Sequence, residues 1–375
     1  MDSGLTRYAP IFWFHENEAF FPIEVRVLVE IADLYKQGVK MPFSRKLEDL
    51  INLEKNGQDY WLEIPDINLG LSKTNNYIIK SKKGYGLTYV AEVIKELFTS
   101  IQNNYKKVIY ARHGNFDINR NDFNANVFSG QWKIKQDVLI GYYDVYQYFP
   151  FYFFNDFTNL HIGDWDSTVE IFHNTTKNIF WIRTHAHHFS WLTKMIRLNH
   201  YTNINNWVQT WRNYTEGVCD IFNLNRHPFI FVSEGGHGCY PTPGYSVRGI
   251  KQVDLPIAFE ERDIGKTCFI PKLDNSGDFT GTTIRDLLSR SSLKTDKLQC
   301  TEYEIIDFDS ETWSKFKGRW GNRSDYNTWD SPVSAPNKSE FKIDKYRFIN
   351  NFNSEYQKKY KTELIFYNYY GPLGD

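Results

Sequence analysis

Residues 161–187, HIGDWDSTVEIFHNTTKNIFWIRTHAH, decide the fold that this sequence predicts. Along residues 164–172 polar and apolar side chains alternate, which is typical of a strand with one buried face. Residues 173–178 are mostly turn formers, and residues 179–187 are rich in β-branched and aromatic side chains. The stretch therefore predicts two antiparallel strands joined as a hairpin.

One register of this hairpin separates its apolar and polar side chains onto opposite faces. If Phe172 pairs with Ile179, two aspartates of the first strand lie opposite two histidines of the second. The predicted pairs are Asp166 with His185 and Asp164 with His187. A slip of one residue would destroy both faces. Two interpretations stay open: a solvated face with ordinary aspartate–histidine pairs, or a catalytic or metal-binding cluster.

A second polar group follows an apolar strand at residues 228–234. This strand ends at Glu234, and three glycines surround the nearby His237. Glycines let backbone and ligand approach closely, so the strand end is predicted to form the edge of a site, although a plain turn fits the same residues. His15 and Glu18, after the N-terminal apolar strand, are interpreted either as groups that support this site or as structural residues.

The composition is that of an ordinary globular protein. The chain has 375 residues, a net charge of −1 and 41% hydrophobic residues, which is ample for a core. The absence of a basic stripe argues against nucleic-acid binding. The four cysteines are widely spaced without a CxxC pair, so neither a disulfide framework nor a cysteine zinc site is expected. Aromatic residues, at 17%, favour strands and can line a sugar- or lipid-binding surface.

The sequence lacks the usual targeting, membrane-spanning and catalytic motifs. The N-terminus has no basic segment followed by an apolar core, and no apolar run approaches the ~20 residues that span a bilayer. We therefore expect no signal peptide, no transmembrane segment and a cytoplasmic location. The common nucleotide-binding, zincin and serine-hydrolase motifs are absent too.

The predicted fold is mainly β, an antiparallel β-sandwich core with α-helical insertions, α+β overall. One large domain is expected over residues 1–375. Outside the β core we expect a helical insertion at 24–105, which includes an amphipathic helix at 87–105, and a loop-rich insertion at 190–226. Polar loops with a helix at 283–291 are expected at 245–310, and a flexible segment at 322–340.

A set of motifs also carries a family resemblance. They are Tyr8-Ala9-Pro10 with His15 and Glu18, the aromatic strand before the hairpin, His161-x-Gly163-Asp164-Trp165-Asp166, residues 185–188, Glu234-Gly-Gly-His237 through Tyr240-Pro241-x-Pro243-Gly244, and Gly318-Arg319-Trp320-Gly321 with Ser331-Pro332. In this order they resemble the vacuolar protein sorting-associated protein 62 family over most of the chain. Members usually have glutamate where this chain has Asp166. The resemblance implies an architecture and a polar site more firmly than a reaction.

A more distant likeness concerns the central motif alone. Asp164, Trp165 and Asp166 resemble part of the His-Asp-Trp-Glu motif of the necrosis- and ethylene-inducing-like proteins. Those proteins are compact β-sandwiches that use a divalent cation to engage membrane sphingolipids. Gly163 stands where that family has its histidine, and the expected lack of a signal peptide departs from that secreted family.

Three functions are therefore weighed. The first is a binding protein whose polar face recognises a lipid headgroup or glycan, with a divalent cation such as Ca, Mg, Mn or Zn. The alternatives are a metal-dependent hydrolase of a phosphoester or glycosidic bond and a structural or trafficking scaffold. The predicted metal ligands are Asp164, Asp166, His185 and His161. The predicted proton-transfer residues are His187 and His237, with Glu234 orienting them.

Overall fold

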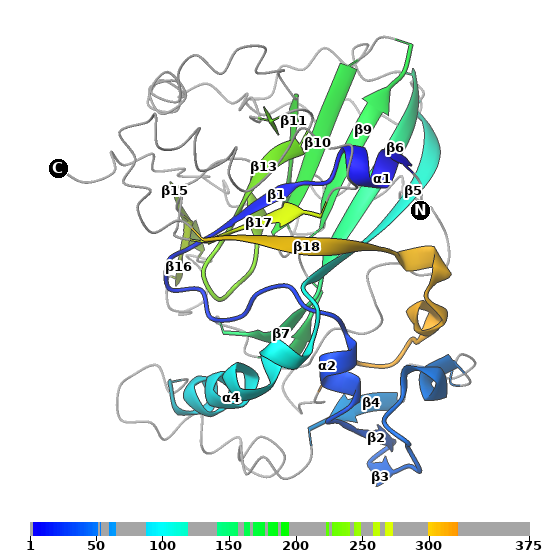
Figure 1. Ribbon diagram of the computed structural model, residues 1–375, viewed down its shortest axis with the longest axis vertical. Coiled ribbons are helices and arrows are strands. Elements are labelled where there is room, and N and C mark those ends of the chain that lie inside the picture. The colour runs from blue at the N-terminus through cyan, green and yellow to red at the C-terminus, as the bar shows by residue number, and fades with distance from the viewer. Residues whose placement is uncertain are drawn as a thin grey trace, which may run out of the picture.

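The computed structural model describes residues 3–51, 53, 60–64, 88–118, 141–156, 161–165, 168–176, 179–186, 189–194, 223–224, 227–240, 244–248, 258–262, 267–272 and 299–321. Within these residues the protein is mainly β, as the sequence predicts. Its strands gather in one large sheet and three small ones (Figure 1). The predicted Asp166, His187, helix at 283–291 and flexible segment at 322–340 lie outside the described residues.

The large sheet has eleven strands among the described residues and mixes parallel with antiparallel pairs. Its strands, in spatial order, are β11 (Phe189–Lys194), β10 (Ile179–Ala186), β9 (Val169–Asn174), β6 (Gly141–Pro150), β5 (Val108–Ile118), β18 (Gln299–Asp307), β17 (Thr267–Pro271), β1 (Ile11–Phe14), β13 (His227–Val232) and β12 (Asn223–Leu224), with β14 (Cys239–Tyr240) also paired to β13. The pairs β5–β18, β18–β17 and β1–β13 are parallel. The predicted antiparallel core is wrong there, because crossovers rather than hairpins bring these strands together.

The central hairpin forms, but its predicted register is wrong by two residues. Phe172 lies opposite Trp181, and Asn174 lies opposite Ile179. A slip of two keeps every side chain on its predicted face, so the alternating pattern could not distinguish the two registers. The observed register shortens the loop between the strands and adds pairs beside it, and short hairpin loops are the common ones.

The chain before this hairpin also departs from the prediction of one continuous strand. Strand β8 (His161–Asp164) ends before β9 begins at Val169. β8 pairs instead with β7 (Tyr152–Asn155) in a separate two-stranded ribbon. Asp164 therefore lies opposite Tyr152 rather than in the hairpin strand β9.

Within the described residues, the predicted helical insertion combines helices with strands. The helix expected at residues 87–105 is confirmed as α4 (Thr88–Ile101), followed by the short 3-10 helix η2 (Gln102–Asn104). Before it the described residues hold α2 (Arg26–Val29), 3-10 turns at residues 47–51, and a three-stranded sheet of β2 (Asp33–Lys36), β3 (Val39–Lys40) and β4 (Tyr60–Glu63). Gln37 and Gly38, with φ of 48° and 85°, form the tight turn between β2 and β3. Two successive positive φ angles are typical of hairpin turns and stop a helix.

Two regions predicted as loops contain strands. The first residues of the expected loop-rich insertion belong to β11. The expected polar loops at 245–310 hold β15 (Gly244–Arg248), β16 (Ala258–Arg262), β17 and β18. β18 was missed because its side chains alternate only weakly between buried and exposed, although it occupies the middle of the large sheet.

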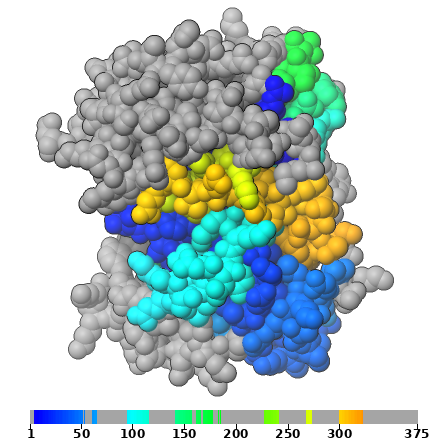
Figure 2. Space-filling view, viewed as in Figure 1, coloured from blue at the N-terminus to red at the C-terminus, as the bar shows by residue number. Residues whose placement is uncertain are grey.

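Two hydrophobic clusters hold these elements together. One lies between α1 (Ser3–Arg7) and one face of the large sheet. The other packs α2, α4 and the small sheet against the aromatic side chains of Phe151, Trp165, Trp313 and Trp320. In Figure 2, α4 (cyan) and residues 26–51 (blue) cover the lower part of the molecule, next to residues 299–321 (orange). The β7–β8 ribbon contributes to both clusters, since Tyr152 belongs to the first and Phe154 and Ile162 belong to the second.

Candidate functional site

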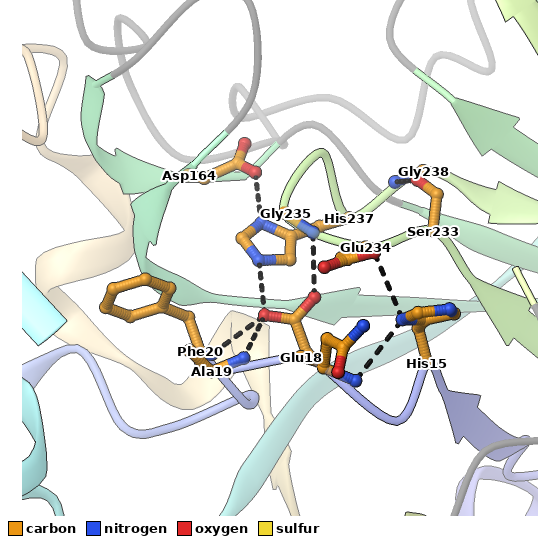
Figure 3. Close-up of polar contacts among 11 residues, drawn as sticks. His15, Glu18, Ala19, Phe20, Asp164, Ser233, Glu234, Gly235, His237 and Gly238 are labelled. Carbon is orange, nitrogen blue, oxygen red and sulfur yellow. Dashed lines mark hydrogen bonds and ion pairs between the residues drawn. The ribbon is translucent and has the colours of Figure 1, made fainter. Parts of the chain in front are cut away.

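A buried charge cluster forms where three distant segments of the chain meet (Figure 3). Its members are Glu18 from the turn after β1, Asp164 at the end of β8, and His237 from the turn after β13. His237 and Asp164 have no exposed surface, and only 1% of the Glu18 side chain is exposed. We call these three residues the charge cluster.

The backbone of β8 fixes Asp164 in this cluster. Two residues of this short strand, His161 and Asp164, pair with Asn155 and Tyr152 of β7. Gly163 has a φ of 72°, and a Cβ atom there would lie 1.6 Å from the carbonyl oxygen of Trp320. A residue with a side chain could not bring β8 so close to this backbone. Gly163 thereby allows the approach that turns Asp164 toward His237.

The turn that carries His237 is held by its own backbone. Ser233 N donates to the Gly238 carbonyl at 3.0 Å, and Gly238 N donates to the Ser233 hydroxyl at 2.9 Å. Gly235 and His237 both have positive φ angles, 63° and 52°. Such a conformation is uncommon for histidine and disfavoured by steric contacts of its Cβ, so the surrounding contacts must maintain it. The three glycines that surround His237 in the sequence therefore belong to this turn.

Both ring nitrogens of His237 face carboxylates. Nδ1 lies 2.9 Å from Asp164 Oδ2, and Nε2 lies 3.5 Å from Glu18 Oε1. The Tyr152 ring stacks on the imidazole with centroids 3.8 Å apart and an interplanar angle of 1°. This packing fixes the plane of the imidazole ring between its two partners.

Glu18 in turn is held by backbone donors. Its Oε1 accepts hydrogen bonds from Ala19 N at 2.9 Å and Phe20 N at 2.8 Å. Its Oε2 accepts one from Gly235 N at 2.9 Å, which links the turn after β1 to the turn after β13. Both carboxylate oxygens are therefore engaged, an arrangement that favours the ionised form.

The pKa values follow from these contacts. Burial alone lowers the pKa of His237, but the carboxylates of Glu18 and Asp164 outweigh it and raise that pKa to about 9. Burial raises the pKa of Glu18, yet the charge of His237 and the backbone donors bring it below the usual value. The pKa of Asp164 is also lowered, because His161 and His237 outweigh its burial. At neutral pH the cluster is thus an imidazolium between two carboxylates, with one net negative charge.

His161 lies on the opposite side of Asp164 from His237. Its Nε2 is 3.6 Å from Asp164 Oδ1, and its side chain is 4% exposed. An imidazole nitrogen and a carboxylate oxygen are both ligand types for divalent cations. The described residues contain no group of three or more such side chains arranged to hold a metal ion. His161 and Asp164 are therefore two side chains of suitable type, fewer than such a group needs.

Glu234 lies at the more exposed edge of the site. Its carboxylate is 3.1 Å from His15 Nδ1, and 40% of the side chain is exposed. The Asn17 backbone N is 3.2 Å from the same nitrogen, which accepts that N–H when it carries no proton and donates to Glu234 when it does. The sequence predicts that Glu234 orients His237, and in the structure the Glu234 carboxylate lies beside His15.

The structure brings together three of the predicted site residues, His161, Asp164 and His237. The backbone of His185 lies on β10 opposite Ser190. The sequence suggests a supporting role for Glu18, but in the structure Glu18 is one of the three members of the charge cluster. Its sequence signals are its position in a short polar turn between aromatic segments and its place in the N-terminal motif of the family resemblance.

Comparison with protein-family models, with curated proteins and with solved structures finds no match for this chain. The resemblance to the vacuolar protein sorting-associated protein 62 family therefore remains a prediction based on its motifs. Within the described residues, no helix has the length and apolar character needed to cross a bilayer.

Proposed function

We propose that this protein is a binding module whose site recognises a lipid headgroup or a glycan through a divalent cation. The observation that carries the proposal is that His237 directs both ring nitrogens at buried carboxylates. A general acid or base needs a nitrogen that faces the substrate and a pKa near the working pH. With a pKa raised to about 9, His237 is better suited to holding Asp164 than to transferring protons.

The side of Asp164 turned away from His237 supports the cation. Two ligands of one cation, each bonded at about 2.0–2.2 Å, lie roughly 3–3.5 Å apart. The 3.6 Å between His161 Nε2 and Asp164 Oδ1 is close to this separation and long for a direct hydrogen bond. Metal-binding carboxylates are commonly fixed by a hydrogen bond from behind, and His237 supplies one to Oδ2.

The cation would complete its ligand shell with oxygens of the bound molecule. Phosphate oxygens and sugar hydroxyls are both suitable donors for hard cations. Asp166, predicted as a further ligand, lies outside the described residues. The site would belong to the β-sandwich architecture that the sequence predicts. A hydrolase at the same place is the second candidate, because a cation held by His161 and Asp164 could also lower the pKa of bound water.

The test starts with the cation alone. We expect Ca²⁺, Mg²⁺, Mn²⁺ or Zn²⁺ to raise the melting temperature of chelator-treated wild type, and to leave Asp164→Asn unchanged. Asp309→Asn, which replaces an aspartate outside the site, is the matched control and should respond like wild type. Equal melting curves for wild type with and without all four cations would overturn the proposal in favour of a scaffold.

A second step identifies the ligand and separates binding from hydrolysis. The loaded protein is mixed with vesicles that carry phosphorylated or glycosylated headgroups and with immobilised glycans. Cation-dependent binding without release of product supports the binding module. Release of phosphate or reducing sugar, lost in Asp164→Asn, would instead identify a hydrolase.

A further inference from the structure

A pair of cysteines lies in the middle of the large sheet, away from the proposed site. Cys268 on β17 and Cys300 on β18 are direct partners in the register of these parallel strands. Their sulfur atoms are 3.3 Å apart. Cys268 is buried and Cys300 is partly exposed, and neither is part of a disulfide.

The backbone at this pair already suits a disulfide bond. Neighbouring strands lie about 4.8 Å apart, which is within the roughly 4.4–6.8 Å that separates the Cα atoms of bonded cysteines. The sulfur atoms need to approach by only about 1 Å to reach the bond length of a disulfide. Side-chain rotation is sufficient for this, so the two strands can keep their register.

We propose that Cys268 and Cys300 form a reversible disulfide when the protein meets a low-molecular-weight disulfide such as oxidised glutathione. The partly exposed Cys300 attacks first, forms a mixed disulfide and releases one thiol of the oxidant. The Sγ of Cys268 then attacks the Sγ of Cys300 and releases the second thiol. The two cysteine protons end on the two released thiols, and the oxidant takes the two electrons.

The position of this bond gives it a structural consequence. The parallel pair β17–β18 joins two parts of the sheet. On one side lie β1 and β13, after which the chain reaches Glu18 and His237. On the other lie β5 and β6, and β6 leads into the ribbon that carries Asp164. The disulfide would tie together the two parts that build the charge cluster.

The cysteine spacing gave no hint of this pair. Some 30 residues separate the two cysteines, and they form no short motif. Only the parallel pairing of β17 with β18 makes them neighbours. The inference does not depend on the proposed binding function.

The full chain is equilibrated with reduced and oxidised glutathione at graded ratios, then trapped with N-ethylmaleimide and digested without reductant. Mass spectrometry should find a peptide pair linked through Cys268 and Cys300 that disappears on reduction. The melting temperature of the oxidised protein should exceed that of the reduced protein by a few degrees, because the bond restricts a loop of about 30 residues in the unfolded chain.

Serine variants test the assignment. Cys239→Ser, at another buried cysteine, should still form the link. Cys268→Ser should instead accumulate the glutathione adduct at Cys300. Cys300→Ser should form neither the link nor the adduct, and it remains informative if the buried Cys268→Ser fails to fold. Unmodified thiols in wild type at saturating oxidant, a link through Cys239 or Cys219, or thiol protection that a chelator removes would each overturn the proposal.

Discussion

The charge cluster and a polar ladder on the large sheet are both buried, yet the chain builds them in opposite ways. The ladder consists of Arg112, Gln147 and Glu170, which lie directly opposite one another on β5, β6 and β9. Arg112 Nε donates to Gln147 Oε1 at 2.8 Å, and Gln147 Nε2 donates to Glu170 Oε1 at 2.5 Å. Regular strand pairing is enough to assemble these three side chains.

The charge cluster has no such support from regular pairing. Its members come from two turns and the end of a two-stranded ribbon. Three residues with positive φ, Gly163, Gly235 and His237, shape these segments. The comparison indicates that the ladder depends on strand register and the charge cluster on backbone conformations that few residues adopt.

The largest loss in the free energy of unfolding is expected from a change to the backbone that supports the charge cluster. Gly163→Ala places a methyl group against the Trp320 carbonyl and keeps a φ that L-residues avoid. We expect a loss above about 4 kcal/mol in the free energy of unfolding, the range of severe steric clashes. Gly38→Ala is the control, because its φ is 85° but no atom lies within 4 Å of the added Cβ. It should lose only about 1–2 kcal/mol.

Urea unfolding of both variants measures this difference. Equal losses would show that the close approach of β8 to Trp320 contributes little, and that positive φ alone accounts for the cost. The charge cluster would then depend on its backbone no more strongly than the turn at Gly38 does.

The next effect concerns the side chains themselves. In Glu18→Gln one carboxylate oxygen becomes an amide nitrogen, which must face a backbone N–H or His237. We expect a loss of about 3–5 kcal/mol, the cost of breaking a buried ion pair. In Glu170→Gln the remaining oxygen can still accept from Gln147, so a loss of about 1–3 kcal/mol is expected.

Chemical unfolding of the two variants at pH 7 compares them directly. If Glu170→Gln proved the more damaging, the ladder rather than the charge cluster would be the principal buried polar support. The comparison between loop-built and strand-built clusters would then be reversed.

The same contrast explains how far the sequence could predict the fold. Alternation of apolar and polar residues predicted β9 and β10, because successive side chains of a strand point to opposite faces. It could not give the register, since a slip of two keeps both faces. It missed β18, whose side chains alternate only weakly between buried and exposed.

For the site, the sequence motifs were a better guide than the predicted strand pairing. The glycines around His237 and the motif containing His161 and Asp164 marked residues that the structure does bring together. The predicted pairing of Asp164 with His187 is wrong because Asp164 belongs to β8, which pairs with β7, so that Asp164 lies opposite Tyr152. Asp166, the predicted partner of His185, lies outside the described residues. The role of Glu18 was underestimated, since nothing in a local pattern shows that a backbone N–H 217 residues away in the chain will donate to it.

The pH dependence of stability offers a third test. The pKa of His237 rises from its ordinary value near 6.5 to about 9 on folding. The protonated imidazole therefore stabilises the fold fully below pH 6.5, and this contribution is lost as the pH rises through 9. The expected loss is on the order of 3 kcal/mol. The lowered pKa values of Glu18 and Asp164 act in the opposite direction, since their contribution is present above about pH 4.5 and is lost in acid.

Urea unfolding in the presence of a chelator, from pH 6.5 to 9.5, measures the contribution of His237. Asp156 also titrates at the lower end of this range, because burial and Glu18 raise its pKa to about 6. His237→Gln keeps Asp156, so the difference between the two profiles reports on His237. His237→Gln should be less stable at pH 6.5 and should show a flatter profile. A wild-type profile parallel to that of His237→Gln would mean that His237 is neutral in the folded protein.

The smallest effects are expected where each cluster reaches solvent. Glu234 pairs with His15 at 3.1 Å with 40% of its side chain exposed, and Asp309 lies 3.9 Å from Arg112 with 57% exposed. Exposed ion pairs contribute about 0–1 kcal/mol, because water screens the charges and the side chains lose freedom when they pair. Glu234→Gln and Asp309→Asn should therefore both change the free energy of unfolding by less than about 1 kcal/mol. A loss for Glu234→Gln near that of Glu18→Gln would extend the charge cluster to the surface, and the Glu234 carboxylate would then hold the turn after β13 together with Glu18 and Asp164.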